Sequence, residues 1–593
     1  MDSETKNCQN CKKDFVIESD DFDFYKKIKV PAPTFCPDCR TQRRMAFRNE
    51  LVLYRKTSAA TEKEIISIFR PDSPMKVYEH EAFYSDNWDP LVYGAEYDFS
   101  KPFFVQFKEL MLRTPTIALF DSKSVNSNYC NVTVEQKNCY MVSAAWTNED
   151  CMYINRGAGN RNSLDLYICG QNEFCYDNLY CEDSYRLFYS HTSHSCNDSY
   201  FLYDCRGCSN CFGCAGLRNK SYCIFNKQYS KDEYLKKIKE FDVGDWNVVQ
   251  DIKRQVLELS LSIPHRYAQI FKSTNAVGDH IHNVKNAYYC FDFLAGAENV
   301  KYSNWSYGEF KDSYDTGPGT GGNSELMYEA VSTGVQNARC MFNFVVWYSH
   351  DVQYSLFCQD SNNLFGCASL RNKSYCILNK QYTKEEYEAL VPKIIAHMNE
   401  MPYVDKKGRV YKYGEFFPTE ISPFPYNDTV AQDYMPLTKE EAETKGYFWG
   451  EIQSRNYKIT KRATDLPAKI SDVTDDIIQE TIGCMHEGTC EDGCATAFRI
   501  LPDELKFYKN LQIPLPRLCF ACRHKDRLKQ RNPMKLWHRK CACAGEKSEK
   551  GMYQNQIKHF HGDKPCPNEF ETSYSPDRPE IVYCEQCYQT EVV

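Results

Sequence analysis

The arrangement of the cysteines constrains this chain more than any other feature of its sequence. Its 31 cysteines fall into three groups: four between residues 8 and 39, seventeen between 130 and 376, and ten between 484 and 587. An odd number cannot all pair in disulfides. The N-terminal residues show no charged and then apolar export segment, so we expect a cytoplasmic protein. There, cysteines are more often metal ligands or core residues than disulfides.

The first group has the spacing of a structural zinc site. Cys8-x2-Cys11 is followed further along by Cys36-x2-Cys39, and two such turns can offer four thiolates in tetrahedral geometry. A domain this small gains too little from its own core to fold alone, so metal binding would also drive its folding. Four protein thiolates leave no open position on the ion, which disfavours a catalytic zinc.

Residues 490–540 repeat this segment at a constant offset of 483. The sequence VPAPTFCPDCR at 30–40 matches IPLPRLCFACR at 513–523, and Arg44 falls on Arg527. The departure lies at the first ligand, where Cys-x3-Cys replaces Cys-x2-Cys. We therefore predict a second zinc site, in which Cys484 is the alternative to Cys490. Its predicted ligands are Cys490, Cys494, Cys519 and Cys522.

A third zinc site is predicted near the C-terminus. CPNEF at 566–570 repeats the Cys-x3-Phe feature of the first two segments, and a Cys-x2-Cys pair follows it. One ligand is then missing, and a histidine stands close by, with Cys543 and His559 as rivals for its place. The predicted ligands are His561, Cys566, Cys584 and Cys587. The chain should therefore bind about three Zn²⁺ ions.

The pattern CxxC…F…FY…P.P..CP.CR resembles the small zinc-ribbon domains of bacteria that are described as probable zinc-binding modules. This resemblance covers a short segment at each end of the chain. The larger arrangement, with ribbons on both sides of a Cys- and Tyr-rich middle, resembles uncharacterised long zinc-ribbon proteins of reduced-genome bacteria. What the resemblance implies is zinc binding, and it brings no established activity.

The middle of the chain is an internal duplication. CFGCAGLRNKSYCIFNKQY at 211–229 recurs as LFGCASLRNKSYCILNKQY at 364–382, and a helix-like segment follows each copy. Aromatic or aliphatic tetrads recur at short and fairly even intervals, separated by turn-forming Asn, Asp, Ser and Gly. Short strands at this spacing, with variable lengths between them, favour a solenoid. We predict a mainly β fold, a parallel β-helix-like solenoid in two duplicated halves with capping helices, flanked by small zinc ribbons.

This organisation divides the chain into eight segments. They are zinc ribbon 1 (1–60), an adaptor (61–120), solenoid half 1 with its capping helix (121–241), a helical connector (242–272), solenoid half 2 with its capping helix (273–403), a linker (404–480), zinc ribbon 2 (481–545) and zinc ribbon 3 (546–593). Prolines in the linker disrupt helical structure, so we predict that the linker is extended. Neither the adaptor nor the linker contains a recognisable catalytic constellation.

Four cysteines of the first half have a spacing with two explanations. Residues 205–214 contain Cys-x2-Cys-x2-Cys-x2-Cys, close to a ferredoxin-type iron–sulfur run. At an offset of 153, Ser361 and Leu364 replace two of the four cysteines. A core position accepts leucine in place of cysteine, whereas a ligand position does not. We predict that these thiols pack in the core, with an iron–sulfur or further zinc site as the alternative.

Positive charge is concentrated in the predicted ribbons. Residues 36–56 contain six basic and two acidic side chains, and residues 519–540 contain eight and one, although the chain carries a net charge of −8. This distribution is typical of local phosphate binding, and the arginine fork suits phosphate oxygens. A solvated basic face, or one that docks on the acidic middle, is the alternative. The predicted nucleic-acid-binding residues are Arg40, Arg43, Arg44, Arg48, Arg523, Lys525, Arg527 and Arg531.

These features predict a non-enzymatic zinc-binding protein, a β-solenoid that presents basic ribbons to RNA or DNA. A protein–protein scaffold is the alternative, with exposed Tyr and Asn of the solenoid contacting partners. An enzyme, either a transferase or a carbohydrate-active β-helix, is less well supported, because no residue pattern points to a catalytic site. No run of about 18 apolar residues occurs, so we expect no membrane-spanning segment.

Overall fold

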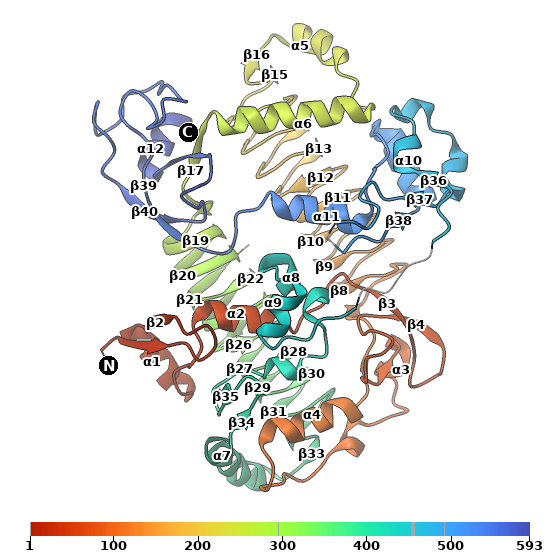
Figure 1. Cartoon of the computed structure of the whole chain (residues 1–593), viewed down its shortest axis with the longest axis vertical. Coiled ribbons are helices and arrows are strands. Elements are labelled where there is room, and N and C mark those ends of the chain that lie inside the picture. The colour runs from red at the N-terminus through yellow and green to blue at the C-terminus, as the bar shows by residue number, and fades with distance from the viewer. Residues whose placement is uncertain (1, 294–295, 452–456, 491–492) are drawn as a thin grey trace. The chain divides into compact units, whose positions relative to one another are not determined.

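The computed structural model describes residues 2–293, 296–451, 457–490 and 493–593. They form two compact units built from non-contiguous parts of the chain. The first unit comprises Met1–Leu119, Ala268–Glu451 and Met534–Leu536, and the second comprises Phe120–Tyr267, Ile452–Pro533 and Trp537–Val593. Each unit contains a ladder of parallel strands (Figure 1). The eight segments predicted from the sequence are a finer division, and their boundaries stay a prediction.

The second unit contains eight parallel strands whose order in the sheet is their order in the chain. They are β7 (Asp121–Ser122), β8 (Asn131–Val134), β9 (Ser143–Trp146), β10 (Asn155–Ala158), β11 (Leu164–Gly170), β12 (Tyr176–Leu179), β13 (Tyr185–Phe188) and β14 (Asn197–Tyr200). The partners Ser143 and Asn155 show the constant register of this ladder, a separation of 12 residues along the chain. Isolated bridges keep this register as far as Phe212 with Ile224. We call residues 121–224 the first stack.

The backbone of the first stack repeats every three residues. Each third residue from Lys123 to Phe225 has a positive φ, between 44° and 70°. This left-handed conformation costs about 1–2 kcal/mol for most L-residues, and Asn and Asp adopt it more readily because their side chains bond locally. Asn126, Asn138 and Asp150 occupy such positions, and their side chains form a ladder of hydrogen bonds of 2.9 and 3.0 Å.

The core of the first stack consists of residues that directly follow the left-handed positions. They therefore also recur at multiples of three, and they include Cys130, Cys139, Val142, Cys151, Ile154, Leu166, Cys175, Leu187, Cys196 and Leu202. A four-cysteine run with three-residue spacing thus fills four successive core positions. Its thiols donate to backbone carbonyls, Cys205 to Tyr203 at 3.5 Å and Cys214 to Phe212 at 3.3 Å. These four cysteines are buried core residues, as predicted.

The first unit contains a longer and less regular set of parallel strands, which we call the second stack (residues 270–377). Its register is not constant, because Ile270 pairs with Ile281 whereas Phe310 pairs with the more distant Ser324. From β27 (Ala338–Met341) to β32 (Ser374–Ile377) the register is the same as in the first stack. Both units are therefore rich in parallel strands, which confirms this part of the predicted fold class.

The strands of the second stack include long and short elements. They are β18 (Ile270–Phe271), β19 (Thr274–His282), β20 (Val284–Phe293), β21 (Ala297–Lys301), β22 (Asn304–Tyr307), β23 (Phe310–Thr316), β24 (Thr320–Gly321), β25 (Ser324–Glu325), β26 (Tyr328–Ala330), β27, β28 (Phe344–Trp347), β29 (His350–Gln353), β30 (Leu356–Gln359), β31 (Asn362–Phe365) and β32. Strands β28 and β30 pair with each other, apart from the main ladder.

Each stack ends in an antiparallel hairpin and a helix, at the duplicated motif of the sequence. Strands β15 (Cys223–Ile224) and β16 (Lys227–Gln228) precede α5 (Lys231–Lys237), and β32 and β33 (Lys380–Gln381) precede α7 (Lys384–Glu400). Both helices begin with a capping box, from Ser230 in α5 and Thr383 in α7. Helix α6 (Trp246–Leu261) occupies the predicted connector. Among the described residues no helix is long and apolar enough to cross a membrane.

Candidate metal centres

The first ribbon shows how a hairpin and a helix bring four thiols together. Strand β1 (Glu4–Asn7) pairs with β2 (Asp14–Ile17), and α2 (Pro37–Met45) begins directly after Cys36. The first cysteine directly follows β1, and the second lies three residues before β2. The other two lie at the N-terminus of α2, where the helix dipole and free N–H groups stabilise thiolates.

The geometry of the first centre fits one zinc ion. The four sulfur atoms of Cys8, Cys11, Cys36 and Cys39 lie within 4.8 Å of one another. The Sγ atoms of Cys11 and Cys36 are 3.7 Å apart, close to the roughly 3.8 Å edge of a tetrahedron with Zn–S bonds of about 2.3 Å. Hydrogen bonds from the thiols of Cys36 and Cys39 lower the pKa of Cys8. All four predicted ligands are thus brought together.

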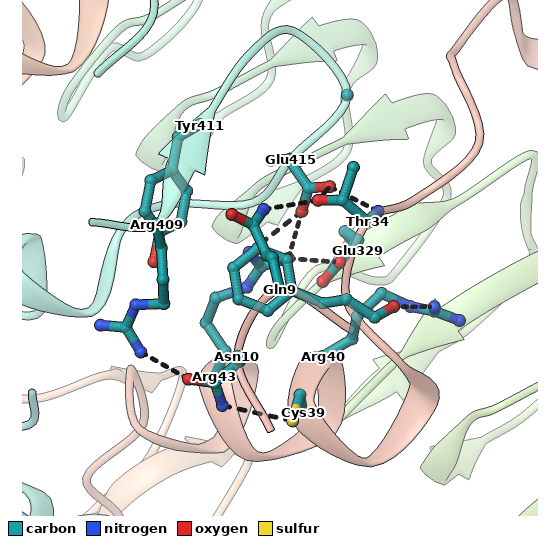
Figure 2. Close-up of polar contacts among 12 residues, drawn as sticks. Gln9, Asn10, Thr34, Cys39, Arg40, Arg43, Glu329, Arg409, Tyr411 and Glu415 are labelled. Atoms are coloured by element: carbon teal, nitrogen blue, oxygen red, sulfur yellow. Dashed lines mark hydrogen bonds and ion pairs between the residues drawn. The ribbon is translucent and has the colours of Figure 1, made fainter. Parts of the chain in front are cut away.

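Outer hydrogen bonds hold this centre in place. The Asn10 amide donates to Cys39 Sγ at 3.2 Å and accepts from Arg409 Nη1 at 2.9 Å (Figure 2). The Gln9 side-chain amide donates to the carbonyl oxygen of Val410 at 3.0 Å and accepts from the Val410 N–H at 2.8 Å. Such partners orient metal ligands. The proline-rich segment that follows the second stack therefore packs against the ribbon.

The second centre uses Cys484 where the sequence predicted Cys490. The sulfur atoms that lie within 4.8 Å of one another belong to Cys484, Cys494, Cys519 and Cys522. Cys484 directly follows β37 (Ile482–Gly483), which pairs with β38 (Ala497–Phe498), so it corresponds to Cys8. The first two ligands are further apart along the chain than in the first ribbon. Hydrogen bonds from the thiols of Cys484 and Cys522 lower the pKa of Cys519, at the start of α11 (Phe520–Lys529), to about 2.

Cys490 lies beside the second centre rather than in its quartet. Its Sγ atom is 3.7 Å from that of Cys522, and it forms a second group with His486 and Cys522. The prediction of Cys490 followed from assuming that the two ligands of the hairpin stay close in sequence. In the structure the longer hairpin loop brings Cys484, the alternative named from the sequence, into the quartet.

The third centre has four cysteines where the sequence predicted three cysteines and His561. The quartet is Cys541, Cys566, Cys584 and Cys587. Cys541 directly follows β39 (Trp537–Lys540), and Cys566 lies three residues before β40 (Glu569–Thr572), which pairs with β39. Helix α12 (Glu585–Val592) begins after Cys584. Cys541 was missed because a long loop separates it from Cys566 in the sequence. A search for cysteine directly after the first hairpin strand would have found it.

Comparison with known proteins adds no assignment to this geometry. No protein-family model matches the chain, and the search of curated proteins returns no match either. The resemblance to zinc ribbons therefore rests on the three quartets, which are consistent with zinc-ribbon-like motifs. Each quartet could hold one zinc ion, in agreement with the predicted number of about three.

The arginines of the first ribbon are buried against carboxylates of the second stack and of the segment after it. Arg40 contacts Asp315 at 2.8 Å. Arg43 contacts Glu329 at 2.8 Å and Glu415 at 3.1 Å (Figure 2). Arg44 contacts Asp315 at 3.1 Å and Glu329 at 3.0 Å. The side chains of these three arginines are at most 2% exposed. These contacts hold α2 against β23 and β26.

Arg48, which lies just after α2, is also buried in contacts with other protein groups. Its Nε atom contacts Glu50 at 2.6 Å, and its Nη1 atom donates to the carbonyl of Pro318 at 2.9 Å and to Ser332 at 2.5 Å. Arg48 is 2% exposed. These four arginines of the first ribbon thus face protein.

The second ribbon repeats this docking on the first stack. Arg527 contacts Asp165 at 2.8 Å and Asp177 at 2.9 Å, and Arg523 contacts Asp165 at 2.9 Å. Arg531 donates to the hydroxyl of Tyr180 at 2.6 Å. Burial opposes ionisation of Asp177, but Lys253 and Arg527 outweigh it and lower its pKa. Helix α11 therefore lies on β11 through ion pairs.

This burial does not fit the predicted contacts with nucleic acid. Arg40, Arg43, Arg44, Arg48 and Arg527 are buried, and Arg523, Lys525 and Arg531 are half-buried. A guanidinium group enclosed by carboxylates does not face a phosphate. The structure instead matches the alternative of a basic face docked on the acidic middle.

The acidic partners of these arginines were missed in the sequence. Asp165, Asp177, Asp315 and Glu329 all have positive φ, between 45° and 57°. They occupy left-handed backbone positions within the two stacks, and the sequence pattern did not reveal these positions.

The terminal cysteines of the zinc centres and the central cysteines of the stacks should differ in their reactivity toward alkylating reagents. Burial raises the pKa of Cys175 and Cys340 to about 12, and all seventeen central cysteines are buried. In native protein treated with a zinc chelator, we expect alkylation at the terminal cysteines, whereas the central ones react only after denaturation. Mass spectrometry of alkylated peptides measures this. Labelling of Cys205 or Cys214 in native protein would contradict the assignment of these residues to the core.

Proposed function

We propose that this protein is a non-enzymatic, zinc-stabilised scaffold that binds protein partners through its two stacks. In this proposal each stack is a solenoid, and zinc ribbons dock on the stacks. The observation that carries the proposal is the use of the ribbon arginines. They pair with Asp315 and Glu329 in one unit and with Asp165 and Asp177 in the other. The charge that would suit nucleic acid is instead used inside the protein.

The constant register supports the solenoid part of the proposal. The same pairing register persists from residue 121 to residue 224, and every third position there is left-handed, which fits a coil of four short sides. A coil of this kind contacts only its neighbours along the stack, so the sides that no ribbon covers are available to partners. Extended repeat surfaces commonly bind partner proteins.

Exposed tyrosines support protein as the class of partner. Tyr129 and Tyr185 of the first stack are 39% and 41% exposed, and Tyr288, Tyr307 and Tyr348 of the second stack are 43–47% exposed. Tyrosine is enriched where protein interfaces are strongest, because it contributes a large contact area and a hydrogen-bonding hydroxyl. The stacks therefore offer exposed tyrosines as contact residues for a protein partner.

A partner captured by the full chain provides the test. We expect a protein that remains bound after nuclease treatment, and alanine replacement of Tyr185 or Tyr288 should weaken its binding about tenfold or more. Leu257 lies on α6 and is 59% exposed, so its replacement by alanine is the matched control, with no change expected. Biolayer interferometry with the purified partner measures these affinities.

Two outcomes would contradict the scaffold. One is equal binding by all variants, since the tyrosine faces would then not be used. The other is a complex that dissolves on nuclease treatment, together with RNA or DNA binding that weakens steeply as salt is raised. That result would instead support nucleic-acid binding by the protein.

A further inference from the structure

The third ribbon contains a second set of metal-binding atoms beside its cysteine quartet. Cys543, His559, His561 and Cys587 each direct one donor atom into a group whose members lie within 4.8 Å of one another. Cys543 Sγ is 3.3 Å from His559 Nδ1, and Cys587 Sγ is 3.4 Å from His561 Nε2. Sulfur and nitrogen ligands on one tetrahedral zinc lie roughly 3.6 Å apart. The donors of this second group are therefore already close to the positions that a metal requires.

Both histidines are oriented by hydrogen bonds on their far sides. His559 Nε2 lies 3.0 Å from Glu591 Oε2, and both side chains are 0% exposed. His561 Nδ1 lies 2.6 Å from the carbonyl oxygen of Lys564. Each ring thus donates its outer N–H to an oxygen and directs its unprotonated nitrogen inward. A carboxylate or carbonyl behind the imidazole is the usual support of a zinc-bound histidine.

Further hydrogen bonds hold Cys543, and the carboxylate of Glu591 behind His559, in place. The Asn555 amide donates to Cys543 Sγ at 3.2 Å and is itself held by the Tyr583 hydroxyl at 2.8 Å. Glu591 accepts from the Tyr553 hydroxyl at 2.9 Å and from the Gln556 backbone at 2.6 Å. A buried carboxylate that is fixed by these donors orients His559 firmly.

Cys587 belongs to both groups of donors. It lies in the quartet with Cys541, Cys566 and Cys584 and also in the group with Cys543 and the two histidines. Its Sγ atom is 3.6 Å from that of Cys566 and 3.4 Å from His561 Nε2. A thiolate has more than one lone pair and can bridge two ions. One zinc held by four thiolates leaves an excess of negative charge in a buried site, and a second zinc with neutral imidazoles reduces it.

We propose that the third ribbon holds two zinc ions bridged by the thiolate of Cys587. One ion is bound by Cys541, Cys566, Cys584 and Cys587, and the other by Cys543, His559, His561 and Cys587. The extra ligands come from the long loop between Cys541 and Cys566, whereas only Gln9 and Asn10 separate the corresponding cysteines of the first ribbon. The second ion orders this loop against α12. The full chain therefore binds four zinc ions.

Metal analysis of the full-length protein tests the proposal. We expect about four zinc ions per chain, and about three after the double replacement of His559→Gln and His561→Gln. His538 is the matched control, because it lies on β39 in the same hairpin as the third centre, is 61% exposed and contacts Glu569 and Glu571. The His538→Gln variant should keep all four ions. Four ions in the double variant, or three ions in the unaltered protein, would overturn the proposal.

Cadmium NMR provides a second measurement that needs no variant. In the unaltered protein loaded with ¹¹³Cd, the bridging thiolate should produce two resonances that are coupled to each other. The double variant could lose both ions of the third ribbon, and its zinc count would then not separate the two sites. In that case the cadmium spectrum of the unaltered protein is the test: coupled resonances support the bridging thiolate, and uncoupled resonances overturn it. A count of three zinc ions would remove only the fourth site. It would leave the proposed scaffold function, which is tested through the tyrosines, unaffected.

Discussion

Replacement of Arg44 by alanine is expected to lower the free energy of unfolding of the first unit by about 3–5 kcal/mol. Arg44 is 0% exposed and lies between Asp315 at 3.1 Å and Glu329 at 3.0 Å. Its removal leaves two buried carboxylates with one cation fewer, and burial already raises the pKa of Glu329. Urea unfolding followed by hydrogen exchange in α2 and β23 measures the loss, since exchange reports on this unit separately.

An exposed ion pair in the same unit is the control for this prediction. Arg55 contacts Glu64, and the two side chains are 73% and 61% exposed. Its replacement by alanine should cost less than about 1 kcal/mol. Neutralising the partners as well, with Arg44→Met, Asp315→Asn and Glu329→Gln, should not recover the stability, because Asp315 also pairs with Arg40 and that buried cation would then lose its carboxylate. An Arg44→Ala protein as stable as the Arg55→Ala protein would contradict the buried network.

The terminal zinc centres were predictable to the extent that their spacing is local. All four ligands of the first centre follow from two Cys-x2-Cys pairs, because its hairpin loop is short. In the other two ribbons the helix pair was found for the same reason. Cys484 and Cys541 were not chosen, because longer hairpin loops bring them to their partners only in the folded chain.

The stacks show a different limit. Parallel strands and buried cysteines followed from the spacing of apolar residues, but the three-residue repeat did not. Residues such as Tyr129 and Val132 adopt a positive φ that neither prefers. The backbone hydrogen bonds between neighbouring parallel strands override the local conformational preference of these residues. Side-chain pattern alone does not reveal such a backbone.

The role of the basic segments was beyond sequence reasoning for a similar reason. Composition shows that positive charge is concentrated in the ribbons, but not what that charge faces. Arg44 and Asp315 are 271 residues apart in the chain, and Arg527 and Asp165 are 362 residues apart. Only the folded structure places them in contact. Charge density was therefore a reliable sign of an electrostatic interface and a poor sign of its partner.

Removal of zinc is expected to unfold the ribbons and to release their helices from the stacks. Binding of a structural zinc ion contributes about 10–16 kcal/mol to the folding of small zinc domains at neutral pH. In the first ribbon the ion links Cys8 and Cys11 of the hairpin to Cys36 and Cys39 at the start of α2. Without it, the helix that presents Arg44 loses its anchor. The carboxylates that this arginine contacts then lose a cation that balances them.

Hydrogen exchange of α2 before and after chelation measures this release. Protection of its amides should fall by orders of magnitude, and the Cys36→Ser variant should show the same change at neutral pH without a chelator. The Cys358→Ser variant is the matched control, because Cys358 is a fully buried core cysteine of the second stack, and it should retain all its zinc. Acidification should also release the metal, because protons compete for the thiolates. A metal-free protein in which α2 keeps its protection would show that the ion pairs hold the ribbon by themselves.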